Sequence, residues 1–370
     1  MLPGLYVHIP FCRSKCPYCG FYSIPSRAPI DGWMEGLQRE ILYHKDHFGR
    51  FDSLYLGGGT PTFLGTEVLE RVMERLLGHF HLTPNPEITI EANPCDITRN
   101  KANALKALGF NRINLGVQSF NNDTLRFLGR GHSAENAEEA IGHLRSAGFQ
   151  NIGLDLIYGL KTQSMKAWMD TLKRALAFQP EHLSCYQLTL EKGTVFERRS
   201  HGKEMITLPE KAAAAHFLAT STFLESKGYS HYEVSNFARG ENFEARHNRK
   251  YWRHIPYLGL GPSAHSFDGK KRWWNVRSVK KYRVALQKGR LPIEGWERLT
   301  KEQLHLESLA LGFRTRRGVD LKSLTFTPAS RETLLMLRKK GLLKIVDGRA
   351  APTLRGFLLA DHLPLCFVAS

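Results

Sequence analysis

Short apolar runs alternate with amphipathic stretches through the first 230 residues, and this alternation constrains the fold more than any other feature. The stretches between the runs, such as LERVMERLLGHF and ENAEEAIGHLRSAGF, carry apolar residues at helical spacing. Strands that alternate with helices in units of about 30 residues predict βαβ construction and a parallel sheet. Six units, rather than eight, predict an incomplete (β/α)6 barrel over residues 1–230. The six apolar runs are GLYVHIP (4–10), SLYLGGGT (53–60), EITIEANP (87–94), RINLGVQS (112–119), NIGLDLIYGL (151–160) and HLSCYQLTL (182–190).

Two further regions follow the predicted barrel. Residues 231–298 are rich in aromatic residues, Gly and His without a steady period, which predicts an irregular region that completes the core. Residues 299–370 contain two helical patterns and the hairpin-like stretch KIVDGRAAP, which predict a small helical domain of winged-helix type. A winged helix serves DNA binding in some proteins and packing in others, so this domain does not decide the function.

The composition indicates a reducing compartment and an acidic partner. No run approaches the roughly 20 apolar residues that cross a bilayer, and the start MLPGLYVHIP lacks the pattern of a signal peptide. We therefore expect a cytoplasmic protein whose six cysteines do not form structural disulfides. The formal net charge is +17, and residues 251–300 hold eleven Lys or Arg against three Asp or Glu. Nucleic acid, an anionic membrane surface and a carboxylate ligand all fit this charge, as does a solvated basic surface.

Three cysteines, Cys12, Cys16 and Cys19, lie within eight residues directly after the first predicted strand. A structural zinc ion requires four ligands, commonly as two pairs, and the remaining cysteines do not form a second pair. Cys95 and Cys366 stand alone, and Cys185 belongs to an apolar strand pattern that predicts a core position. A [4Fe–4S] cluster normally takes one Cys per iron, so three thiolates leave one iron open to an external ligand.

Polar residues also stand on or near the later strands, where a parallel barrel places its active site. The second run ends in Gly58, Gly59 and Thr60, where the missing side chains let backbone N–H groups approach a ligand. Glu91, Gln118 and Asp155 lie within strand patterns and point to the same mouth. A carboxylate among apolar residues is costly unless it has a partner, so these positions indicate a polar or cationic ligand. Arg130 could pair with a ligand carboxylate, although a loop Arg is more often solvated.

The sequence resembles the radical S-adenosylmethionine (SAM) family. CRSKCPYC matches its C-x-x-x-C-x-x-C motif, and Tyr18 is the aromatic residue that typically precedes the last Cys. The segments YVHIPFC, GGGTPT, EANP, GVQSF, GRGH and DLIYGL further resemble the subfamily of oxygen-independent coproporphyrinogen III oxidases and HemW heme chaperones, across essentially the whole chain. The resemblance implies that Cys12, Cys16 and Cys19 hold a [4Fe–4S] cluster. It also implies that SAM is bound by Tyr6, Tyr18, Gly58, Gly59, Thr60, Glu91, Gln118, Arg130 and Asp155.

Three features favour a resemblance to the heme chaperones over the oxidases of porphyrin biosynthesis. Phe21 stands where the oxidase motif carries one more Cys, and five residues precede Tyr6, where the oxidases carry a longer extension. HNRKYW (247–252) is similar to the H-N-x-x-Y-W heme-binding motif of HemW. Without that resemblance, one satisfied histidine in an aromatic core strand would explain the same residues. The implied heme contacts are His247, Asn248, Tyr251 and Trp252, with Arg246, Arg249 and Arg253 near the propionates and His265 as a second candidate ligand.

The resemblance predicts a chaperone that passes heme to respiratory hemoproteins at the membrane. Oxidative decarboxylation of coproporphyrinogen III is the first alternative function. A radical enzyme that modifies nucleic acid is the last, because no RNA-binding module is recognisable and we expect no nucleic-acid partner. A homodimer is compatible with the sequence, and so are transient visits to an anionic membrane. Whether SAM is cleaved or only bound stays open.

Overall fold

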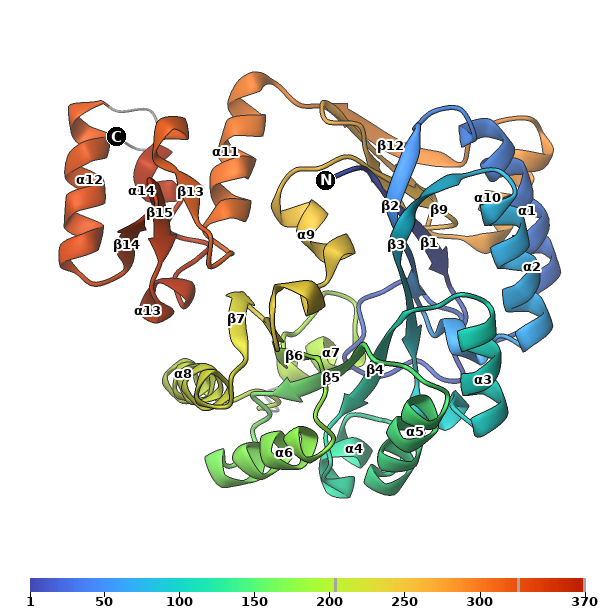
Figure 1. Cartoon of the computed structure of the whole chain (residues 1–370), viewed down its shortest axis with the longest axis horizontal. Helices are drawn as coiled ribbons and strands as arrows, with labels where there is room; N and C mark the ends of the chain where they lie inside the picture. The colour runs from blue at the N-terminus through green and yellow to red at the C-terminus, as the bar shows by residue number, and fades with distance from the viewer. Residues whose placement is uncertain (203–204, 325–326, 369–370) are drawn as a thin grey trace.

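The computed structural model of the chain describes residues 1–202, 205–324 and 327–368. Its centre is a run of six parallel strands in chain order (Figure 1). All six predicted strands are confirmed, and so is the incomplete (β/α)6 barrel. The strands are β1 (Gly4–Ile9), β2 (Arg50–Gly58), β3 (His81–Ala92), β4 (Arg112–Gln118), β5 (Ile152–Tyr158) and β6 (His182–Gln187). The helices of this part are α1 (Ile30–His44), α2 (Thr66–Leu77), α3 (Arg99–Ala107), α4 (Asn122–Phe127), α5 (Ala134–Ser146), α6 (Met165–Ala177), α7 (Val195–His201) and α8 (Glu210–Ser226), with 3-10 turns η1 (Pro61–Phe63) and η2 (Pro94–Asp96).

The two faces of the central strands differ in character. On β1, Leu5, Val7 and Ile9 are fully buried in the main hydrophobic core, whereas Tyr6 and His8 alternate onto the other face. The parallel register sets Tyr6 beside Tyr55 of β2. Farther along the sheet it sets Glu91 beside Asn114 and Asp155 beside Ser184. Helices therefore cover an apolar face, and polar side chains line the inner face of the partial barrel.

The barrel is open because β1 and β6 do not pair with each other. The sheet has twelve strands in the order β12-β11-β10-β9-β1-β2-β3-β4-β5-β6-β8-β7, and the strands β7 to β12 extend both edges. Residues 231–298, expected to be irregular, are therefore mostly ordered. Their strands are short and largely antiparallel, which leaves too few residues per strand for a readable period. The elements are β7 (Ser230–Glu233), β8 (Asn236–Ala238), η3 (Glu241–Phe243), α9 (Arg246–Trp252), β9 (Tyr257–Leu260), β10 (His265–Phe267), β11 (Lys271–Asn275), α10 (Val279–Gln287) and β12 (Ile293–Arg298).

The C-terminal residues form a separate small unit with its own hydrophobic core. The helices and the β14–β15 hairpin agree with the expected winged-helix type, and β13 adds a third antiparallel strand. Of the predicted domain 299–370, residues 325–326 and 369–370 lie outside the described ranges. The elements are α11 (Lys301–Gly312), β13 (Val319–Asp320), η4 (Leu321–Ser323), α12 (Pro328–Lys339), β14 (Leu343–Val346), β15 (Arg349–Pro352), α13 (Leu354–Phe357) and α14 (Leu365–Val368).

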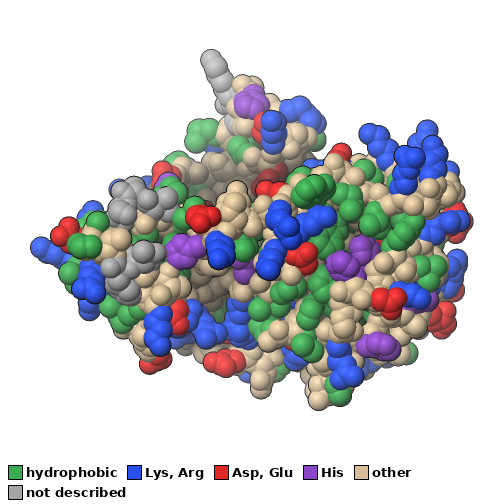
Figure 2. All heavy atoms as spheres, turned by 90° about the horizontal axis from the view of Figure 1, so that it is seen from above, with side chains coloured by type: hydrophobic (Ala, Val, Ile, Leu, Met, Phe, Trp, Pro, Cys, Tyr) green, Lys and Arg blue, Asp and Glu red, His purple; other side chains and the backbone are tan. Residues whose placement is uncertain are grey.

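The surface is strongly basic, as the net charge of +17 requires. Lys and Arg side chains are spread over the face shown in Figure 2, with acidic side chains between them. In the described ranges, no helix combines the length and the apolar character needed to cross a membrane.

A buried carboxylate on α1 fastens the added strands to the barrel. Glu40, only 1% exposed, accepts hydrogen bonds from the Gly261 N–H at 2.7 Å, the Asn275 amide at 2.6 Å and the Tyr282 hydroxyl at 2.6 Å. These donors belong to the turn after β9, to β11 and to α10. Burial raises the pKa of Glu40 to about 7, against the lowering effect of its hydrogen bonds to Tyr282, Gly261 and Asn275. The extension beside β1 thus depends on one side chain that satisfies three donors.

We expect Glu40→Ala to lower the free energy of unfolding by about 3 kcal/mol or more, because each buried donor left without an acceptor costs roughly 1–3 kcal/mol. Urea denaturation of the two proteins measures the difference. Glu35→Ala is the control: Glu35 lies on the same helix but is exposed, and its loss should change stability by less than about 0.5 kcal/mol. Equal effects of the two substitutions would contradict a structural role for Glu40.

Candidate cofactor site

The cysteine loop leaves the C-terminal end of β1 and is held in place from several sides. The Cys12 N–H donates to the Ile24 carbonyl at 3.1 Å, which closes the loop at its base. The Phe196 N–H at the start of α7 donates to the Pro17 carbonyl at 3.0 Å, and the Arg277 guanidinium donates to the Gly20 carbonyl at 3.2 Å. The loop is therefore attached to the barrel, to α7 and to the segment before α10.

The three predicted thiols come together on this loop. Cys12 is buried, and Cys16 and Cys19 are half-buried. The Thr60 hydroxyl donates to the Cys12 sulfur at 3.6 Å, and the Arg130 guanidinium donates to the Cys16 sulfur at 3.4 Å. Burial is the main cause that raises the pKa of Cys12 and of Cys19, so these thiols need a strong positive partner to ionise.

The number of thiols on this loop matches a cluster with one open iron. Within the described residues, no group of three His, Cys, Asp or Glu side chains is placed to hold one metal ion. In an iron–sulfur cluster each thiolate binds a different iron, so the sulfurs stand farther apart than the ligands of one zinc ion. A [4Fe–4S] cluster would be held by Cys12, Cys16 and Cys19.

The other cysteines belong to other segments of the chain. Cys185 is buried in the main core on β6, which confirms its predicted position. Cys95 lies in η2 and donates to the Gly131 carbonyl at 3.1 Å. Cys366 packs against the C-terminal core.

The glycine turn at the end of β2 is shaped by contacts within the protein. Gly58 has φ +108°, and a Cβ there would lie 2.5 Å from the ring of His8. Its N–H donates to Glu91 at 3.1 Å, the Gly59 N–H to the Ile9 carbonyl at 2.8 Å and the Thr60 N–H to the Phe11 carbonyl at 2.8 Å. The expectation that these N–H groups face a ligand is therefore wrong. A ligand amino group, which is a donor, would instead need carbonyl or hydroxyl oxygens of this turn.

Two carboxylates face the interior near the mouth. Glu91 accepts from the Tyr55 hydroxyl at 2.8 Å. Burial raises the pKa of Glu91 to about 7, Asp155 raises it further, and the bonds from Tyr55 and Gly58 lower it. Burial likewise raises the pKa of Asp155 to about 6, against the lowering effects of Ser184, Arg112 and Arg130. Two half-buried carboxyls that resist ionisation fit a ligand that brings positive charge, such as an ammonium or sulfonium group.

Arg130 connects the thiols to the end of β4. Besides Cys16, its guanidinium donates to the Gly116 carbonyl at 3.0 Å, and its Nε is buried without a partner in the described structure. Arg130 is therefore not solvated, although an arginine in a loop more often is. Gln118, the last residue of β4, has φ +66°, a strained conformation for a non-glycine residue that often marks a functional site. Both fit a ligand at this strand end.

The two predicted tyrosines have different surroundings. The His8 Nε2 lies 2.9 Å from the Tyr22 carbonyl and must donate to it, so Nδ1 accepts from the Tyr6 hydroxyl at 3.0 Å. The Tyr6 oxygen can then only accept from a ligand. The Tyr18 ring lies 6.4 Å from the ring of Phe196 in a small apolar cluster under the cysteine loop.

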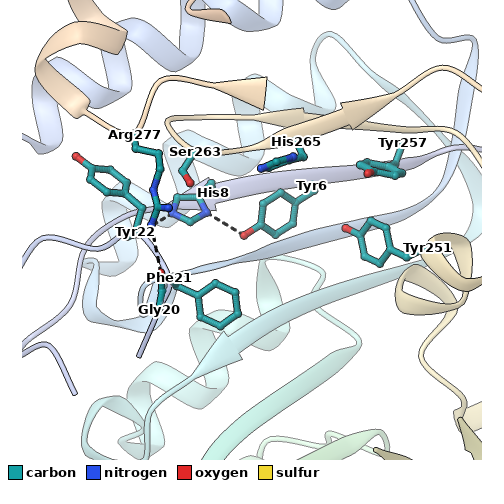
Figure 3. Close-up of a pocket in the computed structure, with 10 residues that line it drawn as sticks. All are labelled: Tyr6, His8, Gly20, Phe21, Tyr22, Tyr251, Tyr257, Ser263, His265 and Arg277. Carbon is teal, nitrogen blue, oxygen red and sulfur yellow. Dashed lines mark hydrogen bonds between the residues drawn. The ribbon is translucent and has the colours of Figure 1, made fainter. Parts of the chain in front are cut away.

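A cavity of about 310 Å³ lies next to the cysteine loop and is lined by residues of β1, β9 and β10 (Figure 3). Aromatic rings form most of its wall, and His265 and Arg277 add polar groups. The sequence analysis named His265 as a second candidate heme ligand but did not name Arg277, His8 or Ser263. These residues were missed because the register of β9 and β10 beside β1 was not predictable. The lining residues are Tyr6, His8, Gly20, Phe21, Tyr22, Tyr251, Tyr257, Ser263, His265 and Arg277.

His247 does not face this cavity. It lies on α9, which was expected as a strand or an irregular segment, and it is only 1% exposed. Its Nδ1 is 2.9 Å from the Ser53 hydroxyl and its Nε2 is 2.9 Å from the Tyr251 hydroxyl. Burial lowers the pKa of His247 to about 3, and Lys250 lowers it further. In this arrangement both ring nitrogens are engaged, so neither is free to bind iron.

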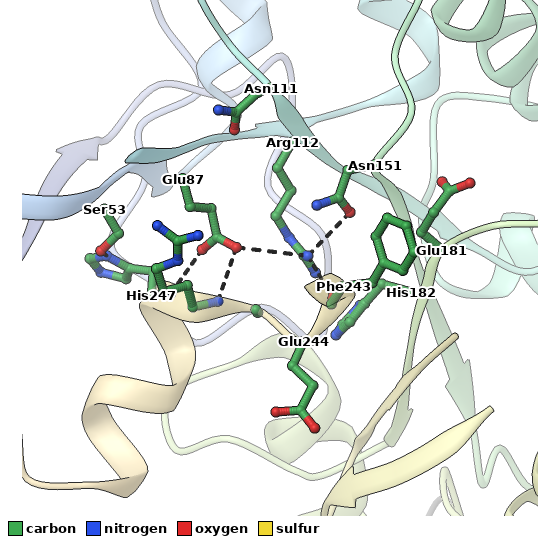
Figure 4. Close-up of polar contacts among 12 residues, drawn as sticks. Ser53, Glu87, Asn111, Arg112, Asn151, Glu181, His182, Phe243, Glu244 and His247 are labelled. Atoms are coloured by element: carbon green, nitrogen blue, oxygen red, sulfur yellow. Dashed lines mark hydrogen bonds and ion pairs between the residues drawn. The ribbon is translucent and has the colours of Figure 1, made fainter. Parts of the chain in front are cut away.

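The rest of the HNRKYW motif supports α9. The Glu87 carboxylate accepts from the N–H groups of Arg246 at 3.0 Å and His247 at 2.8 Å, a favourable negative charge at a helix start (Figure 4). Tyr251 reaches the cavity, Asn248 is half-buried, and the ring of Trp252 is stacked under Arg314 of the C-terminal unit at 5.4 Å. Of the four predicted heme contacts, only Tyr251 lines the cavity.

Comparisons with known proteins identify the family of the chain. The Radical SAM superfamily matches residues 6–175, and the HemN C-terminal domain matches residues 299–359. The heme chaperone HemW of Mycobacterium tuberculosis is 34% identical over 364 residues, which cover 97% of this chain and 93% of that protein. HemW of Bacillus subtilis is 34% identical over 328 residues, covering 87% of this chain and 86% of its own. The structure is similar to coproporphyrinogen III oxidase (HemN) of Escherichia coli, with TM-score 0.86, 27% identity and coverage of 99% of this chain and 90% of that one.

We expect that reconstituted protein loses its visible iron–sulfur absorption when Cys12, Cys16 or Cys19 is changed to Ala, because each would hold one iron. Anaerobic reconstitution followed by absorption spectroscopy and iron analysis measures this. Cys185→Ala and Cys95→Ala are the controls and should keep the cluster. A cluster that survives loss of Cys16, or that needs Cys95, would contradict the assignment.

SAM affinity should fall as the pH drops from 8 to 6. The carboxyls of Glu91 and Asp155 have pKa values raised to about 7 and about 6, so they lose the negative charge that attracts a cationic ligand within this range. Below pH 7 the SAM affinity should fall by up to about tenfold per pH unit. Anaerobic calorimetry measures this affinity. Glu91→Gln should bind more weakly and flatten the profile near pH 7, whereas the exposed control Glu67→Gln should leave it unchanged. A pH-independent affinity in the unaltered protein would remove Glu91 from the site.

Proposed function

The chain belongs to the HemW family of radical SAM proteins, and from this premise we propose that it is a heme chaperone that binds heme and passes it to hemoproteins. One observation carries the proposal: the similarity to relatives named heme chaperones spans the barrel, the added strands and the C-terminal unit. The cavity between the cysteine loop and β10 supports it, because aromatic walls with two imidazoles and one guanidinium suit a flat ring that carries carboxylates.

We further propose that the inner face of the barrel binds SAM beside a [4Fe–4S] cluster. When bound, the cluster supplies single electrons, and SAM supplies a sulfonium that such an electron can cleave. Arg130 would hold the Cys16 thiolate, while Glu91 and Asp155 offer negative charge to the ammonium and sulfonium groups. The oxygens of Tyr6 and Thr60 would accept from the amino group, and Gln118, Tyr18, Gly58 and Gly59 would line the same mouth.

The oxidase is the second candidate function, because the solved structure of Escherichia coli HemN resembles this chain over nearly its whole length. Phe21 argues against it. This residue stands where the oxidases carry the additional Cys, and its side chain is 68% exposed beside the cysteine loop. A phenyl ring has no group that can exchange a proton or bind a metal, whereas it can cover one face of a porphyrin.

We propose that the acceptors are respiratory hemoproteins at the membrane. Lys and Arg side chains are spread over the face in Figure 2, and residues 251–300 hold eleven Lys or Arg against three Asp or Glu. Attraction to an anionic surface is worth about 1 kcal/mol for each nearby basic residue, which supports transient visits rather than anchoring.

Under anaerobic conditions the protein should bind heme in a saturable manner and should not convert coproporphyrinogen III to protoporphyrinogen IX. Heme binding is followed through the Soret band, and the porphyrins are separated after incubation with SAM and a reductant. Transfer is measured by mixing the heme-loaded protein with an apo-hemoprotein. Conversion of coproporphyrinogen without heme binding would support the oxidase instead.

A further inference from the structure

Three histidines surround the inner face of β1, and only one has an unengaged ring. His8 is bonded through both ring nitrogens to Tyr6 and Tyr22, and His247 is bonded through both to Ser53 and Tyr251. His265, the first residue of β10, is exposed, and within the described structure no hydrogen bond or ion pair involves its ring nitrogens. Its ring is stacked on Trp274 at 5.9 Å, which fixes its plane without using its nitrogens.

His265 faces the cavity beside the cysteine loop, together with one cation and several rings (Figure 3). Arg277 follows β11, the strand that pairs with β10, and uses one nitrogen to hold the Gly20 carbonyl, so the rest of its guanidinium can meet a carboxylate. Phe21, Tyr22 and Tyr257 supply aromatic surface to the same cavity. An imidazole, an aromatic wall and a guanidinium are the three elements that heme iron, porphyrin and propionate require.

We propose that heme binds in this cavity, with His265 as the axial ligand of the iron and Arg277 as the partner of a propionate. The inference rests on the proposed heme-binding function and names the residues of its site. The cavity of about 310 Å³ is at the lower end of the ~300–1,000 Å³ that ligand pockets span, so it covers one part of the porphyrin and leaves the rest exposed. A chaperone needs such an open site, because the acceptor must reach the heme.

The electrostatics of the cavity suit this role. Partial desolvation of its ring lowers the pKa of His265, and the positive charges of Arg272 and Arg277 lower it further. The imidazole is therefore neutral at physiological pH and keeps the lone pair that binds iron. The same positive charges attract the anionic propionates.

The heme site and the proposed SAM site share only Tyr6. Gly58, Glu91, Gln118 and Asp155 lie on the other side of β1 from His265 and do not line the cavity. His247 then acts as a positioning residue, because its ring holds the hydroxyl of Tyr251, and Tyr251 forms part of the cavity wall.

The experiment is an anaerobic titration of the reconstituted protein with heme, read as affinity and as the spectrum of the axial ligand. We expect His265→Ala to lose the imidazole-ligated spectrum, to bind heme at least about tenfold more weakly, and to regain the spectrum when free imidazole is added. His247→Ala should weaken binding less and keep the spectrum. His81→Ala is the control, since His81 is an exposed histidine at the far end of the same sheet, and it should behave as the unaltered protein does.

A second comparison tests the propionate contact. Arg277→Gln should weaken binding of heme but not of heme dimethyl ester, whose carboxylates are blocked, while the unaltered protein should prefer heme to its ester. Equal losses for both ligands would show that Arg277 acts through the Gly20 carbonyl, and would overturn its role.

The two proposals can fail separately. If the unaltered protein binds heme and His265→Ala keeps both affinity and spectrum, the site lies elsewhere, although the chaperone function stands. If His247→Ala alone loses the ligand spectrum, the site is at α9 and the inference is overturned. If the unaltered protein binds no heme, the proposed function fails and the inference with it. Cluster absorption and melting temperature, measured for every variant, identify losses caused by misfolding.

Discussion

The pairing of β1 with two neighbours is the constraint on which the rest of the structure depends. β1 forms parallel ladders with β2 on one side and with β9 on the other, so it joins the barrel to the added strands. The cysteine loop begins where β1 ends. It contacts the proposed SAM site through Thr60 and Arg130, and its residues 20–22 line the cavity proposed for heme. The position of the thiols, the glycine turn and the cavity all follow from this strand, because the ladders fix its direction and its register.

Polar groups inside the barrel are the second organising feature. Arg112 is fully buried, and two of its guanidinium nitrogens lack a partner in the described structure, as do Thr89 and Asn114 oxygens nearby. Near the mouth, Glu91 and Asp155 are kept from easy ionisation by burial. Such groups lower stability when they are unsatisfied, and a polar or charged ligand, or ordered water, recovers part of that loss. The inner face is thus built for binding, while the apolar outer face provides the stability.

Much of the barrel was predictable because strong local patterns coincide with its elements. The six parallel strands are buried on a face covered by helices, so each is a distinct apolar run followed by an amphipathic helix. The strands β9 to β12 were not predictable. They are short, antiparallel and partly exposed, and their aromatic residues pack against other segments rather than along a regular period. The same limit applies to α9, a seven-residue helix that Glu87 and Lys250 hold in place through contacts with distant segments.

The sequence by itself determined the chemistry of the cysteine loop, since Cys12, Cys16 and Cys19 are set by spacing along one short segment. It also determined which strands carry Glu91, Gln118 and Asp155, because their runs are local. Only the tertiary structure decided which histidine has a free ring. His247 and His265 are alike as sequence signals, but one is buried between Ser53 and Tyr251 and the other is exposed beside a cavity. Hydrogen-bond partners some 200 positions apart are set by strand register and helix packing, which no local pattern records.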